Sequence, residues 1–264
     1  MTLDLQGALR TARTAARAAG EILLSGFGSN DLGVRAKSHR HDPVTLYDLR
    51  ADETIRSVIA REFPNHAVLS EESGQAGDAD APTWVIDPLD GTNNFLRGIP
   101  HFAVSIALRF PDALLVACVH DPVRGETFTA VAGDGAARNG SPIRVSAQST
   151  LDGAAVAVGF SHHPEQRTKT LNEIPGLIEE ARALRTTGCA ALDLAYVATG
   201  RFDVAWYLAL SAWDVAAGIL LIREAGGRTT DLAGEPLVDP LDGLIASNGL
   251  MHDAFLAALR GSKQ

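Results

Sequence analysis

Two aspartates interrupt an apolar run in the segment WVIDPLDGTNNF. In an extended strand, residues three positions apart point to opposite faces, but Pro88 lacks a ladder donor and is expected to end the strand. A turn at that point brings the carboxylates of Asp87 and Asp90 and the Leu89 carbonyl to one side. Oxygen ligands of this kind suit hard cations such as Mg²⁺.

The two residues after this pair add a possible anion site. Gly91 and Thr92 are expected to open a helix, whose first N–H groups are available to hold a phosphate. Metal ligands and a phosphate cradle would then lie together in the short motif DPLDGT. Taken alone, the same motif is equally consistent with a simple turn that binds nothing.

Two other acidic segments also stand where an element ends or begins. SEESG places Glu71 and Glu72 after the preceding strand, and SAWDVAAG places Asp214 at a helix start. Like charges about 4 Å apart repel by about 4 kcal/mol at an effective dielectric constant of 20, so converging acids must protonate or bind cations. Two or more Mg²⁺ ions would neutralise them and create a two-metal site for phosphoryl transfer. Individually, a solvated loop glutamate or a helix-capping aspartate is the simpler explanation.

The composition is that of an ordinary globular protein. The chain has 264 residues, of which 46% are hydrophobic and 21% charged, enough for a sizeable core. Its formal net charge of −9 argues against a broad cationic nucleic-acid surface, and no apolar run is long enough to predict a membrane span. Cys118 and Cys189 form neither a disulfide framework nor a zinc spacing, so we expect a cytoplasmic protein.

Hydrophobic patterning predicts two helices beside a mostly antiparallel sheet in the first half. Apolar residues recur at helical spacing near the N-terminus, and a second helix is expected from about 48 to 62, ended by Pro64. The runs AVLS, TWVID, HFAVSIALRF and ALLVACVHDP are strand-like, with a polar loop after the first of them. Asn139-Gly140 signals a hairpin.

In the second half, strands and helices alternate. Helices are expected at 164–182 and 250–260 and in AALDLAYVATG and WDVAAGILLIREAGG, with strands in GAAVAVGF, FDVAWYL and GLIASN. This order predicts a layered α/β or α+β architecture. Because no linker separates the halves, we expect a single domain over 1–264, with a soft subdivision into 1–145 and 146–264.

Four segments, DPVTLYD, EES, WVIDPLDGTNNF and WDVAAGILLIREAGG, resemble the inositol monophosphatase family in order and spacing. The bacterial inositol-1-phosphatase-like branch is the most similar. PHFAVSIALR, RTTGCAALDLAYVATGRFD and the first helix also match, so the resemblance covers nearly the whole chain. It implies a layered αβαβα sandwich of the sugar phosphatase type, a homodimer, and lithium-sensitive, Mg²⁺-dependent hydrolysis of a small phosphate ester.

The resemblance also implies roles for individual residues. Two or three Mg²⁺ ions per subunit would be held by a shared set of oxygen ligands: Glu71, Asp87, the Leu89 carbonyl, Asp90 and Asp214. Asp48 and Thr92 match the pair that orients the attacking water, with Glu71 assisting. The implied substrate contacts are Leu89, Asp90, Gly91, Thr92, Arg185, Ala190, Tyr207 and Asp214. Lys37 matches a family lysine on a loop near the site.

One position departs from the family pattern. Inositol-specific members carry a glutamate seven residues before the helix aspartate, and here that position is Tyr207. A tyrosine donates one hydrogen bond but cannot bridge two hydroxyls as an anion. Either the pocket tolerates the change, or the substrate is another phosphate, such as histidinol-phosphate, fructose-1,6-bisphosphate or 3′-phosphoadenosine 5′-phosphate.

Two rival interpretations are weaker. Haloacid-dehalogenase-like phosphatases also place Asp-Gly-Thr after an apolar strand, but their nucleophilic aspartate would occupy the position of Pro88. A non-catalytic, protein-binding scaffold is the alternative from a different class. Such a scaffold is expected to lack some of the metal-binding acids, whereas every acidic position of the motifs holds an acid here.

Overall fold

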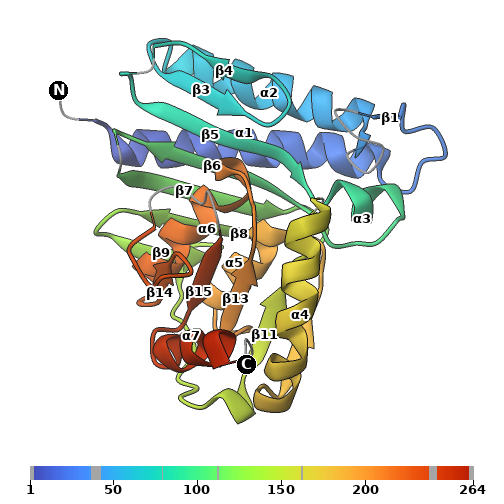
Figure 1. The fold of residues 1–264 in the computed structure, drawn as a ribbon. Coiled ribbons are helices and arrows are strands. Elements are labelled where there is room, and N and C mark those ends of the chain that lie inside the picture. The colour runs from blue at the N-terminus through green and yellow to red at the C-terminus, as the bar shows by residue number, and fades with distance from the viewer. Residues whose placement is uncertain are drawn as a thin grey trace.

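The computed structural model describes residues 3–36, 43–78, 80–111, 113–161, 163–237 and 243–261. Two mixed sheets alternate with pairs of helices, so that the chain forms five layers (Figure 1). The αβαβα sandwich expected from the sequence is therefore confirmed.

The first sheet has eight strands. In chain order they are β3 (Ala67–Ser70), β4 (Gly74–Ala76), β5 (Thr83–Asp90), β6 (Ala103–Arg109), β7 (Leu114–Asp121), β8 (Glu126–Val131), β9 (Gly135–Arg138) and β10 (Ser141–Pro142). Across the sheet the order is β10-β9-β8-β7-β6-β5-β3-β4, antiparallel except for the parallel pair β3 and β5. The loop expected after β3 contains β4, an exposed edge strand without apolar alternation.

Helices α1 (Leu5–Gly26) and α2 (Leu46–Glu62) cover the outer face of this sheet (Figure 1). The buried stripe of α1 consists largely of alanines, which lets the helix lie close to its neighbours. α2 starts two residues earlier than about 48 because Thr45 caps it, accepting from the Asp48 amide while the Asp48 side chain accepts from the Thr45 amide. The short strands β1 (Arg35–Ala36) and β2 (Pro43–Val44) pair beside these helices.

The second sheet has five strands: β11 (Ala155–Val158), β12 (Ala183–Arg185), β13 (Val204–Tyr207), β14 (Arg228–Thr230) and β15 (Leu244–Ser247). Their order is β12-β11-β13-β15-β14, with β11 parallel to both of its neighbours and the other pairs antiparallel. The sequence pattern missed β12 and β14, because three-residue edge strands show no usable alternation.

Helices α5 (Ala190–Ala198) and α6 (Ala212–Glu224) fill the layer between the sheets, and α4 (Pro164–Glu180) and α7 (His252–Gly261) cover the outer face of the second sheet (Figure 1). One buried cluster joins the first sheet to α5, α6 and the second sheet, and it includes Val85, Leu194 and Ala246. Both sheets therefore contribute to one continuous core. No helix within the described residues is long and apolar enough to cross a bilayer.

Candidate active site at the end of β5

A β-bulge shapes the end of β5. Asp87 pairs with Ser105 and Asp90 with Ala103, so a three-residue step on β5 lies opposite a two-residue step on β6. The expectation that Pro88 ends the strand was wrong: β5 continues to Asp90, because a bulge accommodates a residue that cannot donate to the ladder. The extra residue also breaks the alternation that would send the two carboxylates to opposite faces.

Asp87 is buried among other acids. Its side chain is 1% exposed, and its Oδ1 accepts from the Leu89 amide at 3.0 Å. Burial, followed by the charges of Glu71, Asp90 and Asp214, raises the pKa of Asp87 well above its usual range. A hydrogen bond with Glu71 raises it further. The structure therefore brings together the four acidic side chains that the sequence selected.

Parallel pairing of β3 with β5 positions Glu71. β3 ends at Ser70, directly before Glu71, whose amide donates to the carbonyl of Ile86 at 3.1 Å. Behind this strand end, the Ser70 hydroxyl donates to the buried carboxylate of Asp52 in α2. Glu71 is therefore carried on a strand end that is fixed from both sides.

Asp214 arrives from the middle layer, in the first turn of α6. Its Oδ2 accepts from the Ser211 amide at 2.8 Å, completing a capping box at the helix start. The N-cap itself is Ser211, and Asp214 contributes to the cap from the third helical position, which is compatible with its place near Asp87. One carboxylate oxygen anchors the helix while the charge still acts on Asp87.

Asp90 is held by the start of α5. The Ala191 amide donates to Asp90 Oδ2 at 2.6 Å, and the Cys189 thiol donates to the same oxygen at 3.1 Å. Burial raises the pKa of Asp90 to about 6, although these hydrogen bonds act in the opposite direction. The carboxylate therefore has fixed donors on one side and acidic neighbours on the other.

Thr92 and Asp48, which the resemblance pairs, lie within hydrogen-bond distance of each other. The Thr92 hydroxyl lies 3.3 Å from Asp48 Oδ1 and 3.0 Å from the Leu89 carbonyl oxygen. The second oxygen of Asp48 accepts from the Thr45 amide at 2.9 Å and from the Thr45 hydroxyl. Asp48 is 1% exposed, so its orientation is set by the cap of α2.

Gly91 makes the turn from β5 into the short helix α3 (Thr92–Leu96) possible. Its φ is 94°, and a Cβ there would lie 3.1 Å from the His101 carbonyl oxygen, so any other residue would be strained at this position. The Gly91 amide acts to lower the pKa of Asp90, and its role in phosphate binding stays a prediction.

The cluster fits a hard cation in charge and donor type. Among the residues described, no three His, Cys, Asp or Glu side chains form a ready-made metal-binding group. Burial and the charges of the neighbouring acids raise the pKa of Asp87 well above its usual range, which favours a proton on this carboxyl in the metal-free protein. A divalent cation can replace that proton, and the oxygen donors present are those that Mg²⁺ prefers.

The predicted substrate side is only partly assembled. Ala190 is buried at the first position of α5, beside the amide and thiol that hold Asp90. Arg185 is exposed on β12, and within the described residues its guanidinium donates to the Leu184 carbonyl, at 2.9 Å, rather than to any of the acids. Lys37 lies outside the described residues.

Tyr207 is buried, and its hydroxyl donates to Asp193. Its ring covers Gly159, where an added Cβ would lie 2.1 Å from the ring carbon Cε1. Burial raises the pKa of Asp193 to about 7, although the hydrogen bonds from Tyr207 and Thr187 lower it. The Tyr207 hydroxyl is therefore already engaged within the chain.

Sequence reasoning missed Asp193 and the thiol contact of Cys189. Asp193 did leave a signal, since it is a lone acid in the apolar helix segment AALDLAYVA. The bond from Cys189 to Asp90 joins residues 99 positions apart, and nothing in the local pattern points to it.

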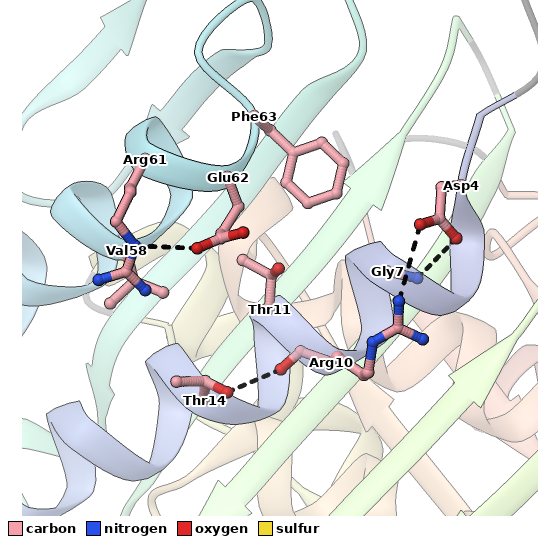
Figure 2. A pocket seen from close by; sticks show the side chains of 9 residues that line it. All are labelled: Asp4, Gly7, Arg10, Thr11, Thr14, Val58, Arg61, Glu62 and Phe63. Carbon is pink, nitrogen blue, oxygen red and sulfur yellow. Dashed lines mark hydrogen bonds and ion pairs between the residues drawn. The ribbon is translucent and has the colours of Figure 1, made fainter.

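A surface hollow of about 340 Å³ lies between α1 and α2 (Figure 2). It is lined by Asp4, Gly7, Arg10, Thr11, Thr14, Val58, Arg61, Glu62 and Phe63. Arg61 pairs with Glu62 at 2.9 Å and Arg10 lies 3.7 Å from Asp4. Its charges are thus balanced at the surface, and none of the predicted site residues lines it.

A family model described as the inositol monophosphatase family matches residues 4–264. The chain belongs to the inositol monophosphatase family. A Pseudomonas aeruginosa relative named Nus factor SuhB is 40% identical over 262 residues, covering 97% of each chain. The Escherichia coli K12 protein of the same name is 42% identical over 254 residues, covering 96% of this chain and 95% of its own.

Solved structures of the inositol monophosphatase family share the fold. The extragenic suppressor protein suhB from Bartonella henselae superposes with a TM-score of 0.92 at 38% identity, covering 96% of this chain and 98% of its own. The inositol monophosphatase from Anabaena superposes with a TM-score of 0.88 at 36% identity, covering 98% and 97%. The resemblance stated from sequence motifs is therefore confirmed.

Proposed function

We propose that this chain is a Mg²⁺-dependent phosphomonoesterase that hydrolyses inositol-1-phosphate or a similar small polyol phosphate by direct attack of water. The observation that carries the proposal is the burial of Asp87 against the charges of Glu71, Asp90 and Asp214. A chain gains nothing in stability by burying like charges together. Such a cluster is typical of sites that bind cations.

The residues proposed to hold two or three Mg²⁺ ions are Glu71, Asp87, the Leu89 carbonyl, Asp90 and Asp214. When bound, the ions supply Lewis acidity and neutralise the charge of the phosphate and of the leaving group. The bulge of β5 contributes the middle three of these donors. The other two come from the end of β3 and the start of α6.

Thr92 and Asp48 are proposed to orient the attacking water. The Thr92 hydroxyl can donate to Asp48 Oδ1, 3.3 Å away, while accepting a hydrogen bond from water. As the water oxygen bonds to phosphorus, its proton passes through Thr92 to Asp48, and the ester P–O bond breaks with its electron pair on the leaving oxygen. Glu71 assists as a second acceptor, and no covalent phosphoenzyme is needed.

Substrate choice is proposed to depend on the position of Tyr207. Because its hydroxyl donates to Asp193, this position offers no anion to a pair of substrate hydroxyls. We therefore expect weaker discrimination among polyol phosphates than a carboxylate would give. Ala190 remains a proposed substrate contact at the start of α5, and Arg185 one on β12.

Phosphate release from a panel of monoesters tests the proposal. Purified protein is assayed with Mg²⁺ on inositol-1-phosphate, histidinol-phosphate, fructose-1,6-bisphosphate and 3′-phosphoadenosine 5′-phosphate. We expect Mg²⁺-dependent turnover of at least one compound, inhibition by lithium, and a higher Mg²⁺ requirement in Asp214→Asn. If Mg²⁺-loaded protein releases phosphate from none of the panel and from no generic aryl phosphate, the proposal is wrong.

A second candidate function comes from the name of the relatives. The name Nus factor SuhB favours a non-catalytic binding role, the alternative that belongs to a different class. The acidic cluster has no evident purpose in a scaffold alone, so hydrolysis is preferred here. Homodimer formation and a cytoplasmic location stay predictions, whereas the name of the relatives argues against the expected absence of a nucleic-acid partner. Light scattering tests the first of these.

A further inference from the structure

Asp193 is a buried acid outside the proposed ligand set, and both of its oxygens are engaged. It lies in the first turns of α5 and is 1% exposed. The Tyr207 hydroxyl donates to Oδ2, and the Thr187 hydroxyl donates to Oδ1 at 2.8 Å. The carboxylate therefore ties the end of β13 to the turn that precedes α5.

That turn and the first two residues of α5, together called the 187–191 turn below, are also tied to the first sheet's side of the site. Asn94 in α3 donates through one amide group to the Thr187 carbonyl at 2.8 Å and to the His101 carbonyl at 2.7 Å. The Thr187 hydroxyl accepts from the Cys189 amide at 3.4 Å. One residue of the turn thus contacts α3, Asp193 and the start of α5.

The far end of the turn holds Asp90. The Cys189 thiol and the Ala191 amide both donate to Asp90 Oδ2, at 3.1 and 2.6 Å. A continuous path of hydrogen bonds therefore runs from Tyr207 in the second sheet, through Asp193 and the turn, to the bulge of the first sheet.

We infer that Tyr207 and Asp193 are positioning residues, which fix the 187–191 turn and through it the Asp90 carboxylate. The inference rests on the proposed function, in which Asp90 is a Mg²⁺ ligand. It changes the role of Tyr207 from a substrate contact to a support of the metal site. The geometry explains why a tyrosine suits this position: its ring covers Gly159 and its hydroxyl reaches Asp193.

Tyr207→Phe tests the inference, because it removes one hydroxyl and keeps the ring over Gly159. Mg²⁺ affinity is measured by calorimetry on substrate-free protein, and kinetics are measured separately at saturating Mg²⁺. Outer-shell partners of ligands typically contribute about 10-fold or more to metal affinity, so we expect Mg²⁺ affinity to fall about 10-fold. The substrate KM at saturating Mg²⁺ should change less than about twofold, since uniform substrate binding is not lost.

Three further variants test whether a change in Mg²⁺ affinity depends on the hydrogen-bond path from Tyr207 to Asp90. Thr187→Val interrupts the same path without touching β13, and it should lower Mg²⁺ affinity as Tyr207→Phe does. Thr187→Ser keeps the hydroxyl and should restore wild-type affinity. Tyr196→Phe removes a hydroxyl from a partly buried tyrosine beside the same core cluster, and it should bind Mg²⁺ as the wild type does.

The results separate this inference from the proposed function. If the wild type binds Mg²⁺ and both Tyr207→Phe and Thr187→Val bind it equally well, the positioning role is wrong while the proposed function stands. A changed substrate KM with unchanged Mg²⁺ affinity in Tyr207→Phe would make Tyr207 a substrate contact instead. A wild type that binds no Mg²⁺ contradicts both.

Discussion

Two buried aspartates in this chain have opposite surroundings. Asp203, which precedes β13 and is 7% exposed, accepts from the Ser146 hydroxyl and, at 2.8 Å, from the Ala155 amide. Asp87 at the end of β5 receives one amide donor and is otherwise surrounded by carboxylates. The carboxylate of Asp203 is surrounded by hydrogen-bond donors, whereas that of Asp87 is repelled by neighbouring carboxylates.

The difference separates structural from chemical use of a buried acid. Around Asp203, Asn248 extends the network by donating to the Ser146 hydroxyl at 2.9 Å, so the acid joins three segments of the second sheet. A buried acid with donors on both oxygens stabilises the fold. A buried acid among acids destabilises the metal-free fold when it is ionised, and that cost is offset when a proton or a cation binds.

The strongest test of this contrast exchanges each acid for its neutral isostere. We expect Asp87→Asn to lower Mg²⁺-dependent turnover by roughly 1,000-fold or more, on the scale of losing electrostatic stabilisation of a transition state. The metal-free variant should unfold at the same temperature as the wild type or higher, because repulsion is removed. Turnover and thermal unfolding without Mg²⁺ measure the two effects.

Asp203→Asn is the matched control. It should keep turnover within a few-fold of the wild type and lose about 1–3 kcal/mol of unfolding free energy, because a hydrogen-bond acceptor is replaced by a donor. Equal behaviour of the two variants would remove the distinction between the regions.

Thr92→Ala tests the proposed orientation of the attacking water rather than the charge of the acidic cluster. We expect turnover to fall roughly 100-fold, as for loss of a positioned proton-transfer group, while Mg²⁺ affinity stays within about twofold. Thr92→Ser retains the hydroxyl and should recover most of the turnover. If Thr92→Ala binds Mg²⁺ poorly instead, Thr92 supports the ligand set and does not orient water.

Raising the pH should destabilise the acidic cluster in metal-free protein. Burial raises the pKa of Asp90 to about 6 and that of Asp87 well above its usual range. The unfolded pKa of such a carboxyl is about 4. When the folded pKa is higher, the carboxyl stabilises the fold fully at a pH below the unfolded pKa. This stabilisation is lost as the pH rises through the folded pKa. Thermal unfolding with EDTA should show this loss, and saturating Mg²⁺ or Asp87→Asn should reduce it.

Lowering the pH should instead destabilise the second sheet, with the smallest of these effects. His252 is fully buried, with Nε2 2.8 Å from the Thr230 hydroxyl and Nδ1 2.8 Å from that of Ser247. Burial lowers the pKa of His252 to about 4. Neutral His252 therefore contributes its full stabilisation of the fold above about pH 6.5, the unfolded pKa of histidine. This stabilisation is lost as the pH falls toward 4. His252→Gln should flatten the unfolding temperature between these values, and an unchanged slope would contradict the assignment.

The acidic positions could be predicted because each one stands where a regular pattern stops. Asp87 and Asp90 end an apolar strand, Glu71 follows another, and Asp214 opens a helix. These boundaries are local properties of the chain. That the four acids meet depends on which strands pair, and the motif resemblance supplied that information.

The supporting contacts could not be predicted, because they are long-range and chemically unremarkable in sequence. The sequence predicts a strand end at Pro88, where the structure has a bulge. A proline indicates a break in the ladder but does not tell whether pairing resumes after it. The edge strands β4, β12 and β14 are too short to show a period. The bond from Tyr207 to Asp193 joins two residues that each look like ordinary core or helix positions.

Proton release on Mg²⁺ binding tests the central claim most directly. The claim is that a cation replaces the proton that burial and the neighbouring acids favour on Asp87. Calorimetric titration of substrate-free protein with Mg²⁺ near pH 6, in buffers of different ionisation enthalpy, counts the protons released. We predict that Mg²⁺ binding releases protons, since ligands lose protons as metal binds, and that Asp87→Asn releases fewer than the wild type. Mg²⁺ binding without proton release, or binding that Asp87→Asn leaves unchanged, would contradict the account.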